Sequence, residues 1–210
     1  MNAHTQRLEL AGPAGALACA QDDPAAAPTA LMVVCHPHPL HGGTMDNKVV
    51  QTIARTGLQL GWRVLRFNFR GVGGSAGGWD EGRGEVDDAL AVVAAGRAAA
   101  PGLPLVLAGF SFGGYVAAAA AALLTEPPRR LALVAPSTQK QTVPPIAEAL
   151  RADTVVIHGE DDEVVPLAAT LDWARLQGLP VTVVPGVGHF FHGRLALLKT
   201  LLLRGLRAVD

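Results

Sequence analysis

The chain reads Leu105-Val106-Leu107-Ala108-Gly109-Phe110-Ser111-Phe112-Gly113-Gly114 near its midpoint. A run of apolar residues typical of a buried strand leads into the first glycine, and an alanine-rich stretch that favours a helix follows the last. A Gly-x-Ser-x-Gly pattern between a strand and a helix predicts a sharp turn with the serine in a strained backbone conformation. Such a turn lifts the serine side chain above the carboxyl end of its strand. Ser111 is therefore the candidate nucleophile.

Short apolar runs alternate with longer helix-like stretches on both sides of this turn. The expected strands cover residues 6–11, 15–21, 30–36, 62–68, 104–109, 131–135, 153–158 and 180–185. The expected helices cover residues 46–60, 81–99, 113–125, 143–151, 167–177 and 193–207. The first two strands flank Gly12-Pro13, which indicates an antiparallel hairpin, and the later alternation indicates parallel strands.

Several expected strands, such as residues 31–35 and 155–157, are apolar almost throughout. Such strands are typical of a sheet that is covered by helices on both faces. The sequence therefore predicts an α/β fold, a three-layer αβα sandwich around a mostly parallel eight-stranded sheet. We expect residues 1–210 to form a single domain. The connection 136–152 must already supply a loop and a short helix, so we expect no separate cap or lid.

The composition favours a substrate that is small or neutral. The 17 Lys and Arg residues nearly balance the 18 Asp and Glu residues, which argues against nucleic acid or an acidic membrane as a partner. Cys19 and Cys35 lie in apolar runs and are expected to be buried free thiols. No signal peptide or membrane-spanning run is evident. We expect a cytoplasmic monomer or homodimer that needs no cofactor.

A serine hydroxyl becomes a strong nucleophile only when a nearby base takes its proton, so a histidine is required. His189 follows the last expected strand and lies on a loop at the carboxyl edge of the sheet, the same edge as Ser111. His192 lies three residues later, at or inside the start of the last helix, and is the rival candidate. The position after the strand favours His189.

The third member of such a site is a carboxylate that accepts the other imidazole N–H and orients the ring. The loop after the preceding strand offers four consecutive acids, Glu160, Asp161, Asp162 and Glu163. Most of them are expected to face solvent, where their negative charges stabilise the N-terminus of the next helix. One of the four should turn inward toward the histidine.

The order Ser111, acid, His189 resembles the α/β-hydrolase superfamily, and the likeness extends over essentially the whole chain. Many members carry Gly-x-x-Asp-x-x-Val on the acid loop, and this pattern falls on Gly159, Asp162 and Val165. The resemblance therefore implies that Asp162 is the orienting acid. A matching block on the final loop likewise implies His189 rather than His192.

Residues 36–48 resemble the oxyanion loop of small bacterial hydrolases described as predicted esterases or dienelactone-hydrolase-like proteins. The resemblance implies a lidless serine hydrolase that cleaves small carboxylic esters or thioesters. Dienelactone hydrolases themselves use a cysteine where this chain has Ser111, so their particular substrate is not implied.

The N–H of Phe112, at the start of the expected helix, is the first candidate donor to a developing oxyanion. The resemblance places the second donor on His38. Prolines stand on both sides of that histidine and have no N–H, so the remaining alternative is Leu40.

Three other interpretations compete with the serine hydrolase. His36, His38 and His41 have a spacing that also occurs in zinc hydrolases, although no acidic residue stands between them. A non-catalytic binding protein could use the same fold, but such proteins are expected to lose one of the three catalytic residues. Gly71-x-Gly73 follows a strand but lacks the third glycine of a dinucleotide-binding turn.

The expected reaction is acyl transfer to water through an acyl-enzyme on Ser111. Only a neutral His189 can accept the serine proton. We therefore expect kcat/KM to rise with pH through one ionisation in the histidine range, near the unperturbed value of about 6.5.

Overall fold

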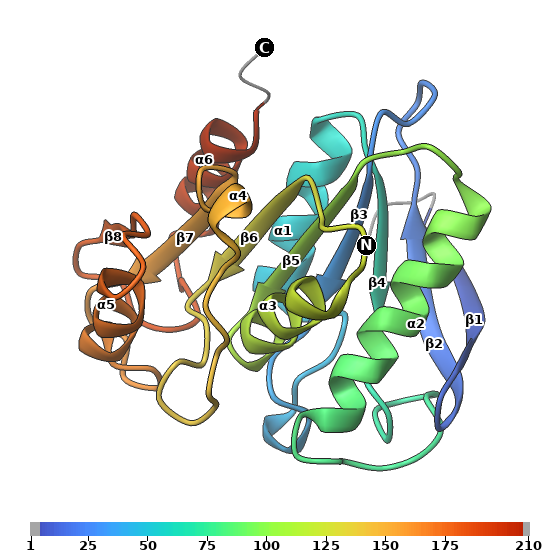
Figure 1. Cartoon of the computed structure of the whole chain (residues 1–210), viewed down its shortest axis with the longest axis horizontal. Helices are drawn as coiled ribbons and strands as arrows, with labels where there is room; N and C mark the ends of the chain where they lie inside the picture. Colours follow the sequence, from blue (N-terminus) through green and yellow to red (C-terminus); the bar gives the residue numbers. More distant parts are fainter. Residues whose placement is uncertain (1–4, 208–210) are drawn as a thin grey trace.

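The computed structural model describes residues 5–207, whose strands form one eight-stranded sheet (Figure 1). The strands are β1 (Gln6–Gly12), β2 (Gly15–Asp22), β3 (Leu31–Cys35), β4 (Arg63–Phe67), β5 (Leu105–Phe110), β6 (Arg130–Val134), β7 (Thr154–Gly159) and β8 (Thr182–Val184). Their order in the sheet is β1-β2-β4-β3-β5-β6-β7-β8. Strand β2 runs antiparallel to both β1 and β4, and all other neighbours are parallel. The mostly parallel sheet predicted from the sequence is confirmed.

Helices cover both faces of the sheet, as the apolar strands require. They are α1 (Lys48–Gln59), α2 (Arg83–Ala99), α3 (Phe112–Leu123), α4 (Glu148–Arg151), α5 (Leu167–Arg175) and α6 (Leu195–Leu206). Helices α1 and α6 pack together on one face, and α2 and α3 pack together on the other (Figure 1). Within residues 5–207, no helix combines the length and the apolar character needed to cross a membrane.

Helix α4 is much shorter than the helix expected over residues 143–151. Pro144 and Pro145 have no N–H to donate, and a proline also disfavours helical conformation in the residue before it. The N–H of Ile146 instead donates to Gln177 Oε1 at 2.7 Å, which ties this connection to the end of α5. A single helical turn, the 3₁₀ segment Pro39–His41, was not predicted.

The two cysteines match the expectation from the sequence. Cys19 on β2 and Cys35 on β3 are both buried and free of disulfides. Burial raises the pKa of the Cys19 thiol to about 12, so it stays protonated near neutral pH. Both thiols therefore act as small apolar core residues rather than as reactive groups.

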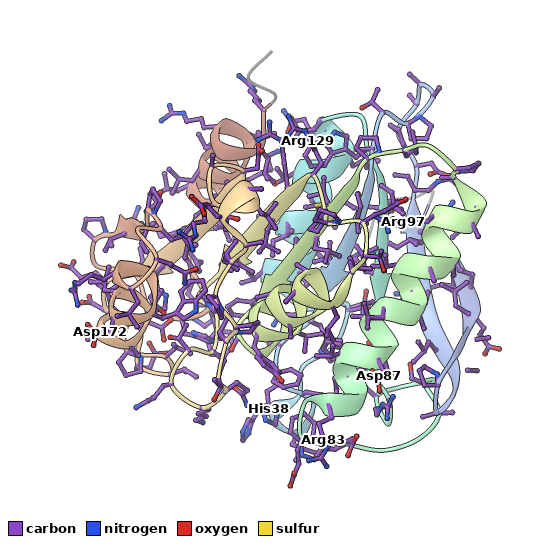
Figure 2. All side chains as sticks on the ribbon, viewed as in Figure 1. His38, Arg83, Asp87, Arg97, Arg129 and Asp172 are labelled. Carbon is purple, nitrogen blue, oxygen red and sulfur yellow. The ribbon has the colours of Figure 1, made fainter. Side chains whose placement is uncertain are left out.

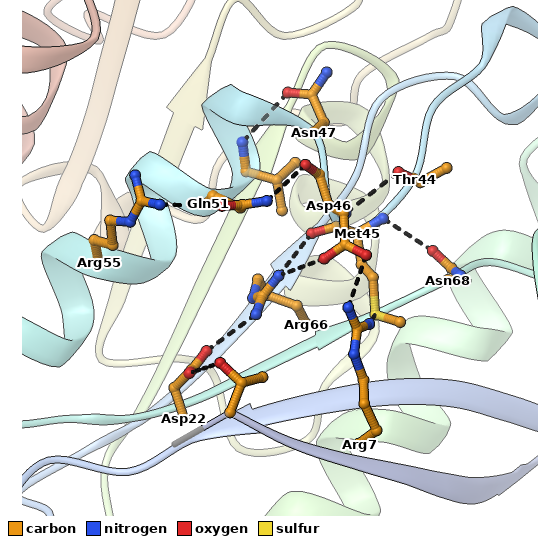
Figure 3. A network of polar contacts seen from close by, with 12 residues as sticks. Arg7, Asp22, Thr44, Met45, Asp46, Asn47, Gln51, Arg55, Arg66 and Asn68 are labelled. Atoms are coloured by element: carbon orange, nitrogen blue, oxygen red, sulfur yellow. Dashed lines mark hydrogen bonds and ion pairs between the residues drawn. The ribbon is translucent and has the colours of Figure 1, made fainter. Parts of the chain in front are cut away.

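A partly buried network of charges connects the N-terminal hairpin to the segment that precedes α1 (Figure 3). Arg66 on β4 is almost fully buried and pairs with Asp22 on β2 and with Asp46, each at 3.1 Å. The same guanidinium donates to the carbonyl of Met45 at 3.0 Å. Arg7 on β1 pairs with Asp46 from the other side at 2.8 Å. These contacts anchor the loop between β3 and α1 at the end next to α1.

Candidate active site

Ser111 occupies the turn between β5 and α3 in the strained conformation that the sequence predicts. Its φ is 57° and its ψ is −121°, in a region that non-glycine residues rarely adopt. Its backbone carbonyl accepts from the N–H of Gly114 at 2.8 Å, and its own N–H donates to Val134 on β6 at 2.9 Å. Hydrogen bonds to the neighbouring strand and to the helix therefore hold Ser111 in this conformation.

Two glycines make the turn possible because a side chain on either would collide with backbone. A Cβ atom on Gly109 would lie 2.0 Å from the carbonyl oxygen of Gly113. A Cβ atom on Gly113 would lie 2.3 Å from the carbonyl oxygen of Cys35 and 2.5 Å from that of His36. The first turn of α3 therefore sits directly against the loop that leaves β3.

Two backbone N–H groups beside this serine are available to bind a negative oxygen. Those of His38 and Phe112 donate to no acceptor among residues 5–207. The N–H of Leu40, the alternative donor, is already used, because it donates to His38 Nδ1 at 3.2 Å. Free N–H groups on both sides of a reacting carbonyl are what an oxyanion hole requires. Figure 2 shows His38 at the carboxyl edge of the sheet, with Arg97 and Arg129 at the opposite edge.

Of the four consecutive acids, Asp162 turns inward and contacts the candidate base. Its Oδ2 lies 2.7 Å from His189 Nδ1, and its Oδ1 accepts the N–H groups of Val164 at 2.9 Å and Val165 at 2.7 Å. Asp161 is exposed, and only its backbone N–H is bonded, to Val187. The structure thus brings Asp162 and His189 together and leaves Asp161 apart.

Within residues 5–207, no hydrogen bond or ion pair joins the other candidates on these two loops to Ser111 or to the carboxylate of Asp162. Glu160 is exposed and accepts the N–H of Gly186 at 3.0 Å. Glu163 is also exposed and accepts the backbone N–H of His189 at 3.3 Å. His192 is exposed and stacks on Phe190. The two glutamates therefore help to hold the loop that carries His189.

His158, at the end of β7, is a residue that the sequence analysis missed. Its side chain is fully buried, and its Nε2 lies 2.9 Å from the carbonyl oxygen of Val165 and 3.3 Å from Asp162 Oδ2. Burial alone would raise the pKa of Asp162, but donors from His158, His189 and Val165 hold that pKa well below its usual range. A histidine four residues before the acid, in an otherwise apolar strand, was the available signal.

Ser111 and His189 line the same cavity of about 290 Å³. One wall consists of Pro37, His38, His41, Gly42, Gly43 and Asn47, and the remaining lining residues are Ser111, Lys140, Val164, His189 and Phe190. Within the part of the chain that the structure describes, the serine hydroxyl makes no hydrogen bond. Such bonds are often long in unliganded sites and tighten when substrate binds. A larger hollow of about 570 Å³ lies among the amino ends of β5, β6 and β7, away from these groups.

His36, one of the three histidines with zinc-like spacing, has both ring nitrogens engaged by backbone. Its Nε2 accepts the N–H of Phe69 at 3.0 Å, and its Nδ1 lies 2.6 Å from the carbonyl oxygen of Pro37. The ring is fully buried and packs against Phe69. Both nitrogens are therefore used to fix the loop after β3, and neither is free to bind a metal ion.

The buried His36 should make the stability of the protein depend on pH. Burial lowers its pKa from 6.5 to about 4, although the hydrogen bond to Pro37 opposes the shift. Between these values the unfolded chain binds a proton that the folded chain does not, so stability falls as the pH falls. The free energy of unfolding should decrease by up to about 1.4 kcal/mol per pH unit in this window from His36 alone.

Urea unfolding at several pH values between 4 and 6.5 would measure this slope in the wild type and in His36→Gln. The variant should show a shallower slope, whatever its absolute stability. Equal slopes in the two proteins would show that His36 does not contribute.

Comparison with known proteins identifies the family. Residues 26–152 match the family described as serine aminopeptidase, S33. This segment is more than half of the chain and includes both Ser111 and the loop with His38. The chain belongs to this family of α/β serine hydrolases.

Two solved structures resemble this α/β serine hydrolase over nearly their whole length. XC6422 from Xanthomonas campestris, described as an α/β serine hydrolase without lid, is 41% identical, with a TM-score of 0.90, and the match covers 99% of this chain and 95% of that one. An α/β serine hydrolase homologue from Coxiella burnetii is 38% identical, with a TM-score of 0.85 and coverage of 96% and 97%. The predicted fold class and the membership of small lidless α/β hydrolases are confirmed. The narrower likeness to dienelactone hydrolases stays a prediction.

An uncharacterized protein from Rickettsia prowazekii is 48% identical over 92 residues. That match spans 43% of this α/β serine hydrolase and only 38% of the relative's own length.

Proposed function

We propose that the protein hydrolyses small carboxylic esters or thioesters through an acyl-enzyme on Ser111. In this proposal His189 is the general base, Asp162 orients it, and the N–H groups of His38 and Phe112 bind the oxyanion. The observation that carries the proposal is that the strained Ser111, His38 with its free N–H and His189 line one cavity, with a buried carboxylate 2.7 Å from the histidine ring.

The proposed reaction has two symmetrical halves. In the first, Ser111 Oγ attacks the carbonyl carbon while its proton passes to His189 Nε2, and the resulting oxyanion accepts the two backbone N–H groups. The intermediate collapses, the proton moves from His189 to the leaving alcohol or thiol, and an acyl-enzyme remains. In the second half, a water molecule replaces the serine as nucleophile and releases the carboxylic acid.

The lining of the cavity favours esters and thioesters over the peptides suggested by the family's description. An aminopeptidase must accommodate the cationic α-amino group of its substrate, and a carboxylate is the natural partner for that charge. Of the described residues that line the cavity, none is Asp or Glu, and one is Lys140. A substrate with a free ammonium group next to the scissile bond would therefore be disfavoured.

Two measurements test the proposal. A fluorophosphonate probe should label Ser111 covalently, as shown by mass spectrometry of the peptide, whereas a non-catalytic binding protein would give no adduct. A substrate panel should then show that p-nitrophenyl esters or acyl-thioesters are better substrates than aminoacyl p-nitroanilides. A clear preference for the anilides would favour an aminopeptidase instead.

The small, open cavity should restrict the enzyme to short acyl chains without interfacial activation. The connection between β6 and β7, where a cap could be inserted, contains only the four-residue helix α4. Each buried methylene gains about 0.8 kcal/mol, but a long chain extending beyond the cavity stays in water and gains little. Acyl groups of roughly two to six carbons should therefore give the highest kcat/KM.

A series of esters from acetyl to palmitoyl, assayed below and above the critical micelle concentration, measures both features. A rise in kcat/KM toward the longest chains, or a jump in activity at the micellar transition, would contradict an open site.

A further inference from the structure

The cavity beside Ser111 is bordered by basic side chains and by no acid among the residues that the structure describes. His38 and His41 come from the loop after β3, and their rings lie 4.6 Å apart. Lys140 enters from the connection between β6 and α4. These three residues share a lining that also carries the apolar side chains of Val164 and Phe190. The cavity therefore offers an apolar side and a basic side.

The positive charge of Lys140 is not neutralised by the protein. Lys140 is an exposed residue, and among residues 5–207 no ion pair or hydrogen bond of its side chain is formed. The pKa of His38 lies below its usual value because the ring is partly buried and because His41 and Lys140 add positive charge nearby. Lys140 and His38 line the same cavity, so the charge of Lys140 lies near the loop that carries a proposed oxyanion donor.

A second hollow of about 320 Å³ adjoins the cavity and also carries basic side chains. It shares Gly42, Asn47 and Phe190 with the cavity and is also lined by Lys48 and His192. The single acid in its lining is Asp46.

The carboxylate of Asp46 is already paired with two arginines, Arg7 at 2.8 Å and Arg66 at 3.1 Å. It therefore does not offset the charge of Lys48 or Lys140. Lys48 and Lys140 therefore place two positive charges beside the cavity that Asp46 does not offset, although the complete chain has a formal net charge of −1.

We propose that this site takes esters or thioesters that carry an anionic group, a carboxylate or a phosphate, positioned to contact Lys140. The inference rests on the proposed hydrolytic function and specifies its substrate class. A negative group on the substrate would supply the partner that Lys140 lacks, while a short apolar segment would contact Val164 and Phe190. The charges of Lys48 and Lys140 would also attract such substrates toward the cavity.

The anion could belong to the acyl part or to the leaving group, and two matched substrate pairs distinguish these sources. The acyl pair is the p-nitrophenyl monoester of glutaric acid against p-nitrophenyl pentanoate, which carries a methyl group where glutarate has its carboxylate. The leaving-group pair is butyryl-CoA, with its phosphates, against the neutral butyryl thioester of N-acetylcysteamine. In at least one pair the anionic member should have a kcat/KM about five- to tenfold higher.

Lys140→Gln should lower kcat/KM for the preferred anionic substrate about five- to tenfold more than for its neutral partner, and Lys140→Glu should lower it further. Lys199→Gln, on α6 and outside both hollows, is the matched control and should leave both values unchanged. The preference should also shrink when salt rises from about 0.01 M to about 1 M, because the Debye length falls from about 30 Å to about 3 Å.

Equal kcat/KM values within both pairs, or an equal effect of Lys140→Gln on anionic and neutral members, would overturn the inference. Those results would leave the proposed function intact, because the neutral esters would still be hydrolysed in a Ser111-dependent manner. A failure of the proposed function would appear differently, as an absence of turnover with all four substrates.

Discussion

Replacement of Ser111 by alanine should lower kcat for the best ester substrate by about 10⁴- to 10⁶-fold, to a level near the detection limit. The alanine variant has no oxygen that could form the acyl-enzyme, while the cavity and both free N–H groups remain. Because alanine can occupy the same turn, the loss should come from the chemical step and not from unfolding. Steady-state kinetics and fluorophosphonate labelling of the variant measure the effect directly.

Ser137→Ala provides a matched control for this substitution. Ser137 is also buried and lies close to the same turn, since its N–H donates to the carbonyl of Ser111 at 3.1 Å. Its hydroxyl donates to Gln141 and does not line the cavity. The control should keep most of the activity. If Ser111→Ala retained activity within tenfold of the wild type, another group would have to be the nucleophile.

Replacement of Asp162 by asparagine should lower kcat by about 10⁴-fold with little change in the shape of the site. An asparagine amide can donate to His189 Nδ1 and so favours the tautomer with the proton on Nε2, which cannot accept the serine proton. Asp161→Asn is the control, because that exposed neighbour does not contact the histidine. A severe loss in Asp161→Asn together with a mild one in Asp162→Asn would overturn the assignment.

The low pKa of Asp162 limits which group can cause a loss of activity at mildly acidic pH. The pKa of Asp162 is held well below its usual range, so this carboxylate stays ionised throughout the range in which activity would be measured. Any loss of kcat/KM on mild acidification must then come from a different group, and His189 is the one that the proposed mechanism requires to be neutral.

The strands and the nucleophile turn were predictable because each is encoded by neighbouring residues. The Gly-x-Ser-x-Gly pattern specifies a strand, a strained serine and a helix within ten residues, and the apolar runs specify strands that are covered on both faces. The choice of Asp162 among four acids came from resemblance alone. The structure supplies its physical reason, which is that only this carboxylate accepts both Val165 N–H and His189 Nδ1.

Other features depend on contacts between distant segments and could not be predicted in this way. The contact of His158 with Asp162 exists because the acid loop folds back over the end of its own strand. The choice between His38 and Leu40 as a free donor follows from a side chain that turns to cap a short 3₁₀ segment. Pro144 and Pro145 already indicate a shorter α4. Its extent, however, depends on the hydrogen bond from Ile146 N–H to Gln177, a residue distant in the sequence.

The buried pairs of Arg66 bear on how this protein can be modified for practical use. They join β2 and β4 to Asp46, at the end of the loop that carries His38, and the pair of Arg7 with Asp46 adds β1. Replacing Arg66 would leave the buried carboxylate of Asp22 without its cationic partner, and breaking a buried ion pair in this way typically costs about 3–5 kcal/mol. Affinity tags, immobilisation linkers or truncations that disturb residues 6–22 therefore risk loosening the oxyanion loop, and such attachments are better placed on exposed surfaces around Leu176, beyond α5.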